Sequence, residues 1–349
     1  MDHSQPHPEF FNLPMGSDDF QDMPYVHLGR SGLRVSKVGL GTWKIGRPET
    51  GDGARVDEGT AFKIFDRAIE LGVTFWDTAN RYNDSSGNSE RVIGEWFRHN
   101  PDQRRNIVLA TKMRWMMDGR TPNHAGLSRG NILDSVCASL ARLRLDYVDV
   151  LYFHGFDPAT PVEESLAAIE DLVSRDLVRY FAVSNFTADQ LSLYGAAEQS
   201  LSPRCRVLAV QNQFDILHGE SARFQGTLEF AAGSGISFVA WSPLARGVLT
   251  ERYLDPATAG PGDRLHDEGT LERDASGQVM EKLHGLARLA QGWELTLSQL
   301  ALAYMLSLPG MGPVIPSVSS VAQLESNAVA GQVVLDDSQK SQVQEILQP

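Results

Sequence analysis

Four side chains that can exchange protons follow the ends of three strand-like segments of this sequence. Asp77 ends the segment VTFWD, and Tyr82 follows it by five residues. Lys112 and His154 end the next two segments of the same kind. Neighbouring strands lie about 4.8 Å apart, so groups at successive strand ends can converge. A buried ammonium beside a phenol would lower the pKa of the phenol from about 10 and make it a usable acid. We therefore expect a site that delivers a proton to a carbonyl oxygen while a hydride reaches its carbon.

Each of these residues also has a purely structural interpretation. An ion pair between Asp77 and Lys112 at the rim of a barrel is often structural. A tyrosine such as Tyr82 is commonly a packing aromatic, and a histidine such as His154 is commonly a buried polar group with satisfied hydrogen bonds. We favour the catalytic interpretation because chance rarely places four proton-exchanging groups at successive strand ends.

The rest of the chain supplies the elements that would hold these residues in place. Eight segments rich in β-branched and aromatic residues alternate with amphipathic helical segments. The strand-like ranges are 37–42, 73–78, 106–112, 147–154, 178–185, 206–214, 236–243 and 312–317. This alternation fits a doubly wound open sheet or a closed (β/α)8 TIM barrel. Several strands end in a polar or small residue, and a barrel brings all eight carboxyl ends to one rim, so we predict the barrel.

Three further segments lie outside the alternating pattern. Turn residues within 26–38 separate two short apolar runs and predict a β-hairpin that caps the bottom of the barrel. Two long loops, 113–128 and 242–276, follow strand ends and would overhang the site at the carboxyl-terminal face. We expect residues 1–22 to form a flexible N-terminal extension and residues 23–349 to form a single barrel domain.

The composition argues against several classes of function. The formal charge is −13, from 31 basic and 44 acidic residues without a basic cluster, which disfavours nucleic acid and anionic membranes as partners. No apolar run approaches the ~18 residues of a membrane span, and the polar start does not resemble a secretory signal. Cys137 and Cys205 are widely spaced, so we expect two buried thiols in a reducing compartment and a cytoplasmic protein. Nothing in the sequence suggests a metal site.

Three segments, FWDTANRY, LATK and VDVLYFH, resemble the signature segments of the aldo-keto reductase superfamily in the same order and spacing. The resemblance extends from residue 23 over nearly the whole chain through GLGTW, GNSERVIGEW, FAVSNF, VQNQF, WSPLARGVLTERY and VIPSVSSVAQLESN. In detail the chain looks closest to the branch with potassium-channel beta subunits, bacterial YghZ-like reductases and aryl-alcohol dehydrogenase-like enzymes. This resemblance implies a (β/α)8 barrel that reduces carbonyl compounds with NAD(P)H. It assigns Asp77, Tyr82, Lys112 and His154 to the catalytic tetrad, with Tyr82 as proton donor.

The same resemblance assigns residues to a nicotinamide dinucleotide. Ser184, Asn185 and Gln211 match the side chains that hold the nicotinamide carboxamide, and Trp241 matches the aromatic that stacks on the ring. Arg252 takes the place of a lysine that contacts phosphate. The other expected cofactor residues are Thr42, Trp43, Asp77, Ser242, Pro243, Leu244, Gly247, Ser317, Ser319, Ser320, Gln323 and Asn327. The last five belong to a segment that would bind the adenosine end at a helix N-terminus, although SVSSVAQL alone is also an ordinary helix cap.

The sequence departs from the family pattern in three places, and the first two, at Ser317 and Ser326, bear on the choice between NADP and NAD. Ser317 stands where glycine is common, and Ser326 and Gln213 each replace a frequent glutamate. The adenosine segment contains no basic residue for a 2′-phosphate, which favours arginine. Because Arg252 and Arg264 could reach the phosphate from the long loop, we expect NADP(H), with NAD as the alternative.

The expected substrate residues are Trp43, Tyr82, Trp115, His154 and Phe156. An aromatic, concave site suits a planar or sugar-like carbonyl compound, although Trp115 could instead pack its own loop. Our first hypothesis is the reversible reduction of an aldehyde, ketone or sugar carbonyl to the alcohol. The alternative is a nucleotide-binding regulatory or scaffold subunit of the channel-beta type with incidental turnover. The implied partner is a small carbonyl or alcohol substrate, and an oligomer is possible.

Overall fold

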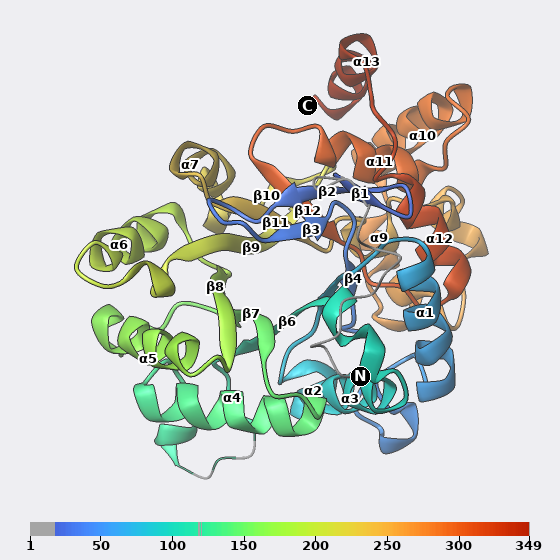
Figure 1. Cartoon of the computed structure of the whole chain (residues 1–349). Helices are drawn as coiled ribbons and strands as arrows, with labels where there is room; N and C mark the ends of the chain where they lie inside the picture. The colour runs from blue at the N-terminus through green and yellow to red at the C-terminus, as the bar shows by residue number, and fades with distance from the viewer. Residues whose placement is uncertain (1–17, 118, 120, 349) are drawn as a thin grey trace, which may run out of the picture.

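Eight parallel strands form a ring that helices cover from the outside (Figure 1). The computed structural model describes residues 18–117, 119 and 121–348. The strands are β4 (Leu40–Gly41), β5 (Phe75–Asp77), β6 (Val108–Met113), β7 (Val148–Phe153), β8 (Val178–Ser184), β9 (Val207–Asp215), β11 (Ser237–Trp241) and β12 (Met311–Ile315). Each strand pairs with the next, and bridges from Val38 to Val314 and from Gly41 to Ser317 join the first strand to the last. The predicted (β/α)8 TIM barrel is confirmed.

Helices connect the strands, and local sequence signals begin and end several of them. They are α1 (Glu58–Glu70), α2 (Tyr82–Ser85), α3 (Asn88–His99), α4 (Arg129–Leu143), α5 (Val162–Ser174), α6 (Ala188–Glu198), α7 (Thr227–Ser234), α8 (Arg264–Asp267), α9 (Leu271–Asp274), α10 (Gly277–Gly292), α11 (Leu297–Leu306), α12 (Val321–Val329) and α13 (Asp337–Leu347). Ser128 caps α4 by accepting a hydrogen bond from the backbone N–H of Asn131.

Short 3-10 helices and one extra strand complete the connections. The 3-10 helices are η2 (Pro48–Thr50), η3 (Pro101–Asn106), η4 (Pro122–His124), η5 (Pro203–Cys205), η6 (Ala222–Phe224), η7 (Ala245–Gly247), η8 (Glu251–Tyr253) and η9 (Pro256–Thr258). The strand β10 (Gly219–Glu220) pairs antiparallel with the end of β9. Three of the 3-10 helices, together with α8 and α9, lie within the long loop 242–276 that the sequence predicted.

An antiparallel sheet of β1 (Asp19–Phe20), β2 (Met23–His27) and β3 (Arg34–Ser36) closes the amino-terminal end of the barrel. Leu28 and Val35 are fully buried and pack with the inward-facing side chains of the strands. The backbone N–H of Gly29 donates to Ser237 Oγ at 2.7 Å, at the start of β11. The predicted hairpin cap is therefore present. The expected extension 1–22 lies largely outside the described residues, and β1 falls within its last part.

An aromatic cluster between the strands and the outer helices fixes β5. The ring of Trp76 stacks on Phe65 of α1 with centroids 4.7 Å apart, and it lies 5.1 Å from the ring of Trp96 of α3. Successive side chains of a strand point to opposite faces. Because Trp76 points outward into this cluster, Asp77 points into the barrel.

Two observations concern the compartment predicted from the sequence. Within the part of the chain that the structure describes, no helix combines the length and the apolar character that a membrane span requires. Cys205 is buried, whereas Cys137 is exposed on α4, so the expectation of two buried thiols was wrong for Cys137. Its place on the outer face of an amphipathic helix explains the difference.

Candidate active site

Asp77, Tyr82 and Lys112 meet at the carboxyl-terminal end of the barrel. Asp77 ends β5, Lys112 lies on the neighbouring β6, and Tyr82 begins α2. Lys112 Nζ lies 2.6 Å from Asp77 Oδ2 and 2.6 Å from the hydroxyl oxygen of Tyr82. The phenol also lies 3.2 Å from Asp77 Oδ2, so the three groups are in direct contact. The Lys112 and Asp77 side chains are 1% and 2% exposed, which makes this a buried ion pair.

Neighbouring groups hold the ion pair in place. Lys112 Nζ donates a third hydrogen bond to the carbonyl oxygen of Thr78 at 2.9 Å. Gln211 Nε2 donates to the other carboxylate oxygen, Asp77 Oδ1, at 2.8 Å. Thr42 Oγ1 donates to the backbone carbonyl oxygen of Asp77 at 2.9 Å. Thr42 is buried beneath the site and supports the strand end without lining the cleft.

His154 lies beside the phenol after the end of β7. Its ring centroid lies 6.2 Å from that of Tyr82, and its backbone N–H donates to the carbonyl oxygen of Met113 at 2.9 Å. Burial and the charges of Lys112, Arg81 and Arg114 hold the pKa of His154 well below its ordinary value. The imidazole is therefore neutral near pH 7. A neutral ring can donate one N–H to a carbonyl oxygen.

The acidity of Tyr82 differs from the sequence expectation. Burial and the Asp77 carboxylate raise the pKa of Tyr82 well above its ordinary value, whereas we expected Lys112 to lower it. The expectation was wrong because desolvation penalises a phenolate, and the Asp77 carboxylate opposes a second negative charge beside it. Burial in turn lowers the pKa of Lys112, and Asp77 opposes that effect. The phenol consequently keeps its proton at neutral pH, which is the state that a proton donor requires.

A cleft of about 740 Å³ runs from these residues to the N-terminal end of α12. It brings together most of the side chains expected to bind a cofactor. The expected residues that line it are Trp43, Asp77, Tyr82, His154, Ser184, Asn185, Gln211, Trp241, Ser242, Pro243, Leu244, Gly247, Arg252, Ser317, Ser319, Gln323 and Asn327. Thr42 and Ser320 do not line it. Ser320 instead caps α12 by accepting from the backbone N–H of Gln323 at 3.3 Å.

Polar side chains link the strand ends along the floor of the cleft. Asn185 Nδ2 donates to the carbonyl oxygen of His154 and to Ser184 Oγ, both at 3.1 Å. Ser184 Oγ donates to the carbonyl oxygen of Gln211 at 2.9 Å. Asn185 adopts a φ of 59°, a left-handed conformation that asparagine tolerates better than most residues. These bonds fix an amide-rich surface next to Tyr82.

Ion pairs organise the long loop that forms the opposite wall. Arg252 pairs with both carboxylate oxygens of Asp263, and Arg246 pairs with Glu268 and Asp274. Across the cleft, Arg55 Nη1 lies 3.2 Å from Asp267 Oδ2 and joins the loop after β4 to α8. These ion pairs hold both loops in place over the cleft.

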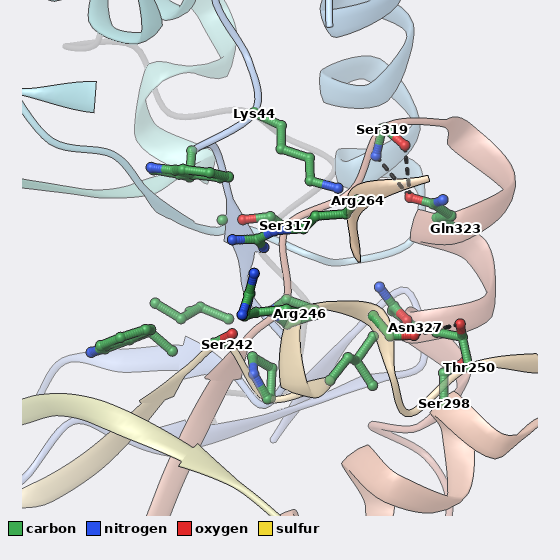
Figure 2. Close-up of a pocket in the computed structure, with 18 of the residues that line it drawn as sticks. Lys44, Ser242, Arg246, Thr250, Arg264, Ser298, Ser317, Ser319, Gln323 and Asn327 are labelled. Atoms are coloured by element: carbon green, nitrogen blue, oxygen red, sulfur yellow. Dashed lines mark hydrogen bonds between the residues drawn. The ribbon is translucent and has the colours of Figure 1, made fainter. Parts of the chain in front are cut away.

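Sequence reasoning missed Lys44 and Arg246, which also line the cleft. Figure 2 shows Lys44, Arg246 and Arg264 gathered around it. The Lys44 ammonium makes no hydrogen bond or ion pair with any residue that the structure describes. Burial and the charges of Arg264 and Arg55 lower the pKa of Lys44 to about 8, and Glu268 opposes this shift. The sequence signal that could have identified Lys44 is its position, two residues beyond the predicted end of the first strand.

Two expected substrate residues do not line the cleft. Phe156 packs edge-on against Phe186, with centroids 5.7 Å apart, and against Tyr194 at 6.4 Å. Trp115 lies on the loop after β6, is 40% exposed, and contacts Arg114 and Arg81 through its ring. The structure therefore places Phe156 in an aromatic packing cluster and Trp115 outside the wall of the main cleft.

Comparison with known proteins agrees with this geometry. A model of the aldo/keto reductase family matches residues 37–348, which is most of the chain. The chain belongs to the aldo/keto reductase family. The family consists of oxidoreductases, and its members generally bind nicotinamide cofactors.

Curated relatives of this aldo/keto reductase carry two kinds of name. A probable voltage-gated potassium channel subunit beta of Arabidopsis thaliana is 33% identical over 322 residues, covering 89% of this chain and 92% of the relative. A protein of the same name from Oryza sativa subsp. japonica is 30% identical, covering 89% and 92%. An aldo-keto reductase of Alternaria alternata is 33% identical over 343 residues, covering 90% of this chain and 89% of the relative.

Proposed function

We propose that this aldo/keto reductase catalyses the reversible, NADP(H)-dependent reduction of an aldehyde, ketone or sugar carbonyl to the alcohol. The observation that carries the proposal is the contact of Tyr82 with Lys112 and Asp77 at one end of the long cleft. A nicotinamide dinucleotide bound in the cleft would supply the hydride. Tyr82 would supply the proton.

The residues of the cleft fit a dinucleotide. Asn185, Gln211 and Ser184 offer amide and hydroxyl groups for the carboxamide, and Trp241 offers a flat surface for the ring. At the far end, Asn327 and Gln323 line the cleft beside the N-terminus of α12, where backbone N–H groups favour an anion. The side chains thus match the polarity of such a ligand from end to end.

The proton chemistry follows from the contacts of Tyr82. As the phenol gives up its proton to a carbonyl oxygen, Lys112 Nζ stands 2.6 Å from the oxygen that becomes negative. A fixed cation at that distance stabilises the developing phenolate without rearrangement. The neutral ring of His154 can donate to the same carbonyl oxygen and orient it. The reverse reaction returns the proton to Tyr82.

The preference for NADP(H) is supported by cations in the wall of the cleft, including Lys44, which sequence reasoning missed. Lys44 and Arg264 lie on the same side of the cleft, and the Lys44 ammonium, which has no partner among the described residues, would gain one by binding an anion. NAD(H) carries no 2′-phosphate, so it lacks the anionic group that these cations would bind. Arg252 is already paired with Asp263 and Arg264 with Glu268, which makes Lys44 the better candidate.

The test is steady-state turnover by the purified full chain. NADPH and NADH are each offered with a panel of aromatic, aliphatic and sugar aldehydes, and oxidation of the nicotinamide is followed by absorbance. We expect turnover with NADPH to exceed turnover with NADH. Oxidation of neither nucleotide with any aldehyde of the panel would contradict the proposal.

The channel-beta relatives support a second candidate, a nucleotide-binding regulatory or scaffold subunit in which turnover is incidental. The same turnover experiment separates the two functions. Tight NADPH binding without reduction of any aldehyde in the panel would favour the regulatory role.

A further inference from the structure

Two arginines flank an exposed indole next to the catalytic residues. Arg81 directly precedes Tyr82, whereas Arg114 and Trp115 follow Lys112 on the loop after β6. The guanidinium carbon of Arg114 lies 4.0 Å from the centroid of the Trp115 ring, and that of Arg81 lies 5.3 Å from it. Stacking of this kind occupies the flat face of a guanidinium and leaves its N–H edge free to bind an acceptor.

This cluster lies against His154. A Cβ atom placed on Gly155, the next residue, would lie 3.4 Å from Arg114 Cδ and 3.7 Å from Trp115 Cζ2. Both distances are those of ordinary van der Waals contacts, so the arginine and the indole lie directly beside the residue that follows the catalytic histidine. Tyr82 and His154 are the groups that would hold a carbonyl oxygen, and the charges of Arg81 and Arg114 both act on His154, so the two cations lie beside the place where a substrate would bind.

Neither guanidinium has an acidic partner within residues 18–117, 119 and 121–348. Arg114 Nε is also buried without a hydrogen-bond partner among them. The charge of the Asp157 carboxylate acts on Arg114, but this carboxylate accepts its hydrogen bonds from the N–H of Leu127, the N–H of Ala159 and the hydroxyl of Thr160. Arg223 adds a further positive charge to the surroundings of Arg114. An unpaired, partly buried donor is costly, and binding an oxyanion would remove that cost.

We propose that Arg81 and Arg114 bind an oxyanion group on the substrate. The preferred substrate class is then an aldehyde or ketone that also carries a carboxylate or a phosphate. The exposed face of Trp115 packs against the apolar part of such a molecule. This inference rests on the proposed function. It gives Trp115 a substrate-binding role because the indole lies between two cations.

The test compares substrates that differ only in charge. 4-Carboxybenzaldehyde and its neutral methyl ester are reduced by the wild type and by Arg81→Met and Arg114→Met. We expect the wild type to prefer the carboxylate in kcat/KM by at least about tenfold. Each variant should lower this preference by about 10- to 100-fold, the range for a hydrogen bond to a charged group. Glyceraldehyde 3-phosphate against glyceraldehyde then distinguishes a phosphate from a carboxylate.

Two controls make the result specific. Arg105→Met removes an exposed arginine of η3 and should leave the carboxylate-to-ester ratio as in the wild type. Arg114→Lys keeps the charge but not the forked donors, so it should recover only part of the preference. An unchanged ratio in Arg81→Met and Arg114→Met, with both aldehydes turned over, would overturn the inference and leave the proposed function intact.

Absence of all turnover would count against the proposed function, and the anion site is then measured directly. Terephthalate is titrated calorimetrically into the NADPH-loaded wild type and the Arg81→Met/Arg114→Met double variant. Binding by the wild type alone supports the site. Equal heats in the two proteins would overturn it.

Discussion

All three N–H donors of Lys112 are occupied, by Asp77, by the carbonyl oxygen of Thr78 and by Tyr82. The ammonium cannot turn away as the phenol loses its proton, so its stabilising effect is available at every turnover. The sequence was sufficient to bring these residues together, because strand ends and side-chain alternation determine their positions. It was not sufficient to predict the acidity of Tyr82, because that depends on how completely the surrounding chain excludes water.

Replacing Tyr82 with phenylalanine removes the proton donor and keeps the ring. We expect kcat for carbonyl reduction to fall by about 10²- to 10⁴-fold, the usual contribution of a general acid. The dissociation constant of NADPH, measured by fluorescence titration, should change by less than about twofold, since the phenol serves proton transfer. A variant that keeps most of its kcat would show that another group donates the proton.

Replacing Lys44 with methionine tests the cation at the cleft wall. We expect the dissociation constant of NADPH to rise about tenfold while that of NADH changes little, since a charge-assisted bond is lost. Lys44 has a pKa of about 8, so in the wild type NADPH affinity should decline as pH rises through that value and the ammonium loses its charge. The variant should lack this decline.

Two comparisons make the Lys44 prediction specific. Lys44→Arg should retain most of the affinity, and Arg252→Ala should have a smaller effect because Arg252 is already paired with Asp263. Equal losses for NADPH and NADH in Lys44→Met would remove the 2′-phosphate assignment.

At the scale of elements, hydrophobic patterning located every strand of the barrel, but the ends of several strands differ from the prediction. The first strand was expected over 37–42, whereas β4 covers only Leu40–Gly41 and the bridge at Val38 stands alone. Strand ends depend on the pairing of neighbours, which a single segment does not encode. The positions of Lys44 and Arg264 depend on contacts between loops distant in sequence, such as Arg55 with Asp267, so periodicity gave no information about them.

The β2–β3 turn offers a test of the hairpin cap. At Gly29, where φ is +57°, a Cβ atom would lie 2.2 Å from the carbonyl oxygen of Leu208. Gly29→Ala should therefore lower the free energy of unfolding by about 1–3 kcal/mol in urea denaturation. Gly32→Ala is the matched control, because a Cβ there would meet nothing within 4 Å. Equal stability of the two variants would mean that the turn is not pressed against the barrel.

At the scale of the whole molecule, one closed ring lets residues from distant parts of the sequence act at one place. Asp77 and Gln211 are 134 residues apart and share a hydrogen bond of 2.8 Å. The family resemblance predicted the overall architecture because the sequence segments that match the family lie at successive strand ends. The sequence did not predict that Arg81 and Arg114 lack an acidic partner among the described residues, because that depends on the partners that carboxylates such as Asp157 find in the fold.

The stability of the fold should depend on the charge of His154. Its folded-state pKa lies well below the ordinary 6.5, so the unfolded chain binds a proton more readily than the folded chain does. Stability should therefore increase with pH up to about 6.5 and decrease as pH falls below it. His154→Gln should show a shallower slope of unfolding free energy against pH in that range. Parallel slopes would show that other groups cause the acid sensitivity.

Packed side chains fill the interior of the barrel, and Leu28 and Val35 of the hairpin cover its amino-terminal end, so ligands enter and leave through the cleft at the carboxyl-terminal rim. Two ligands that share one opening bind and leave in a fixed order. A nucleotide beneath the long loop would have to bind before the carbonyl compound that lies above it, and it would dissociate after that compound has left. Product-inhibition patterns should accordingly be those of an ordered mechanism, with the oxidised nucleotide competing against the reduced one.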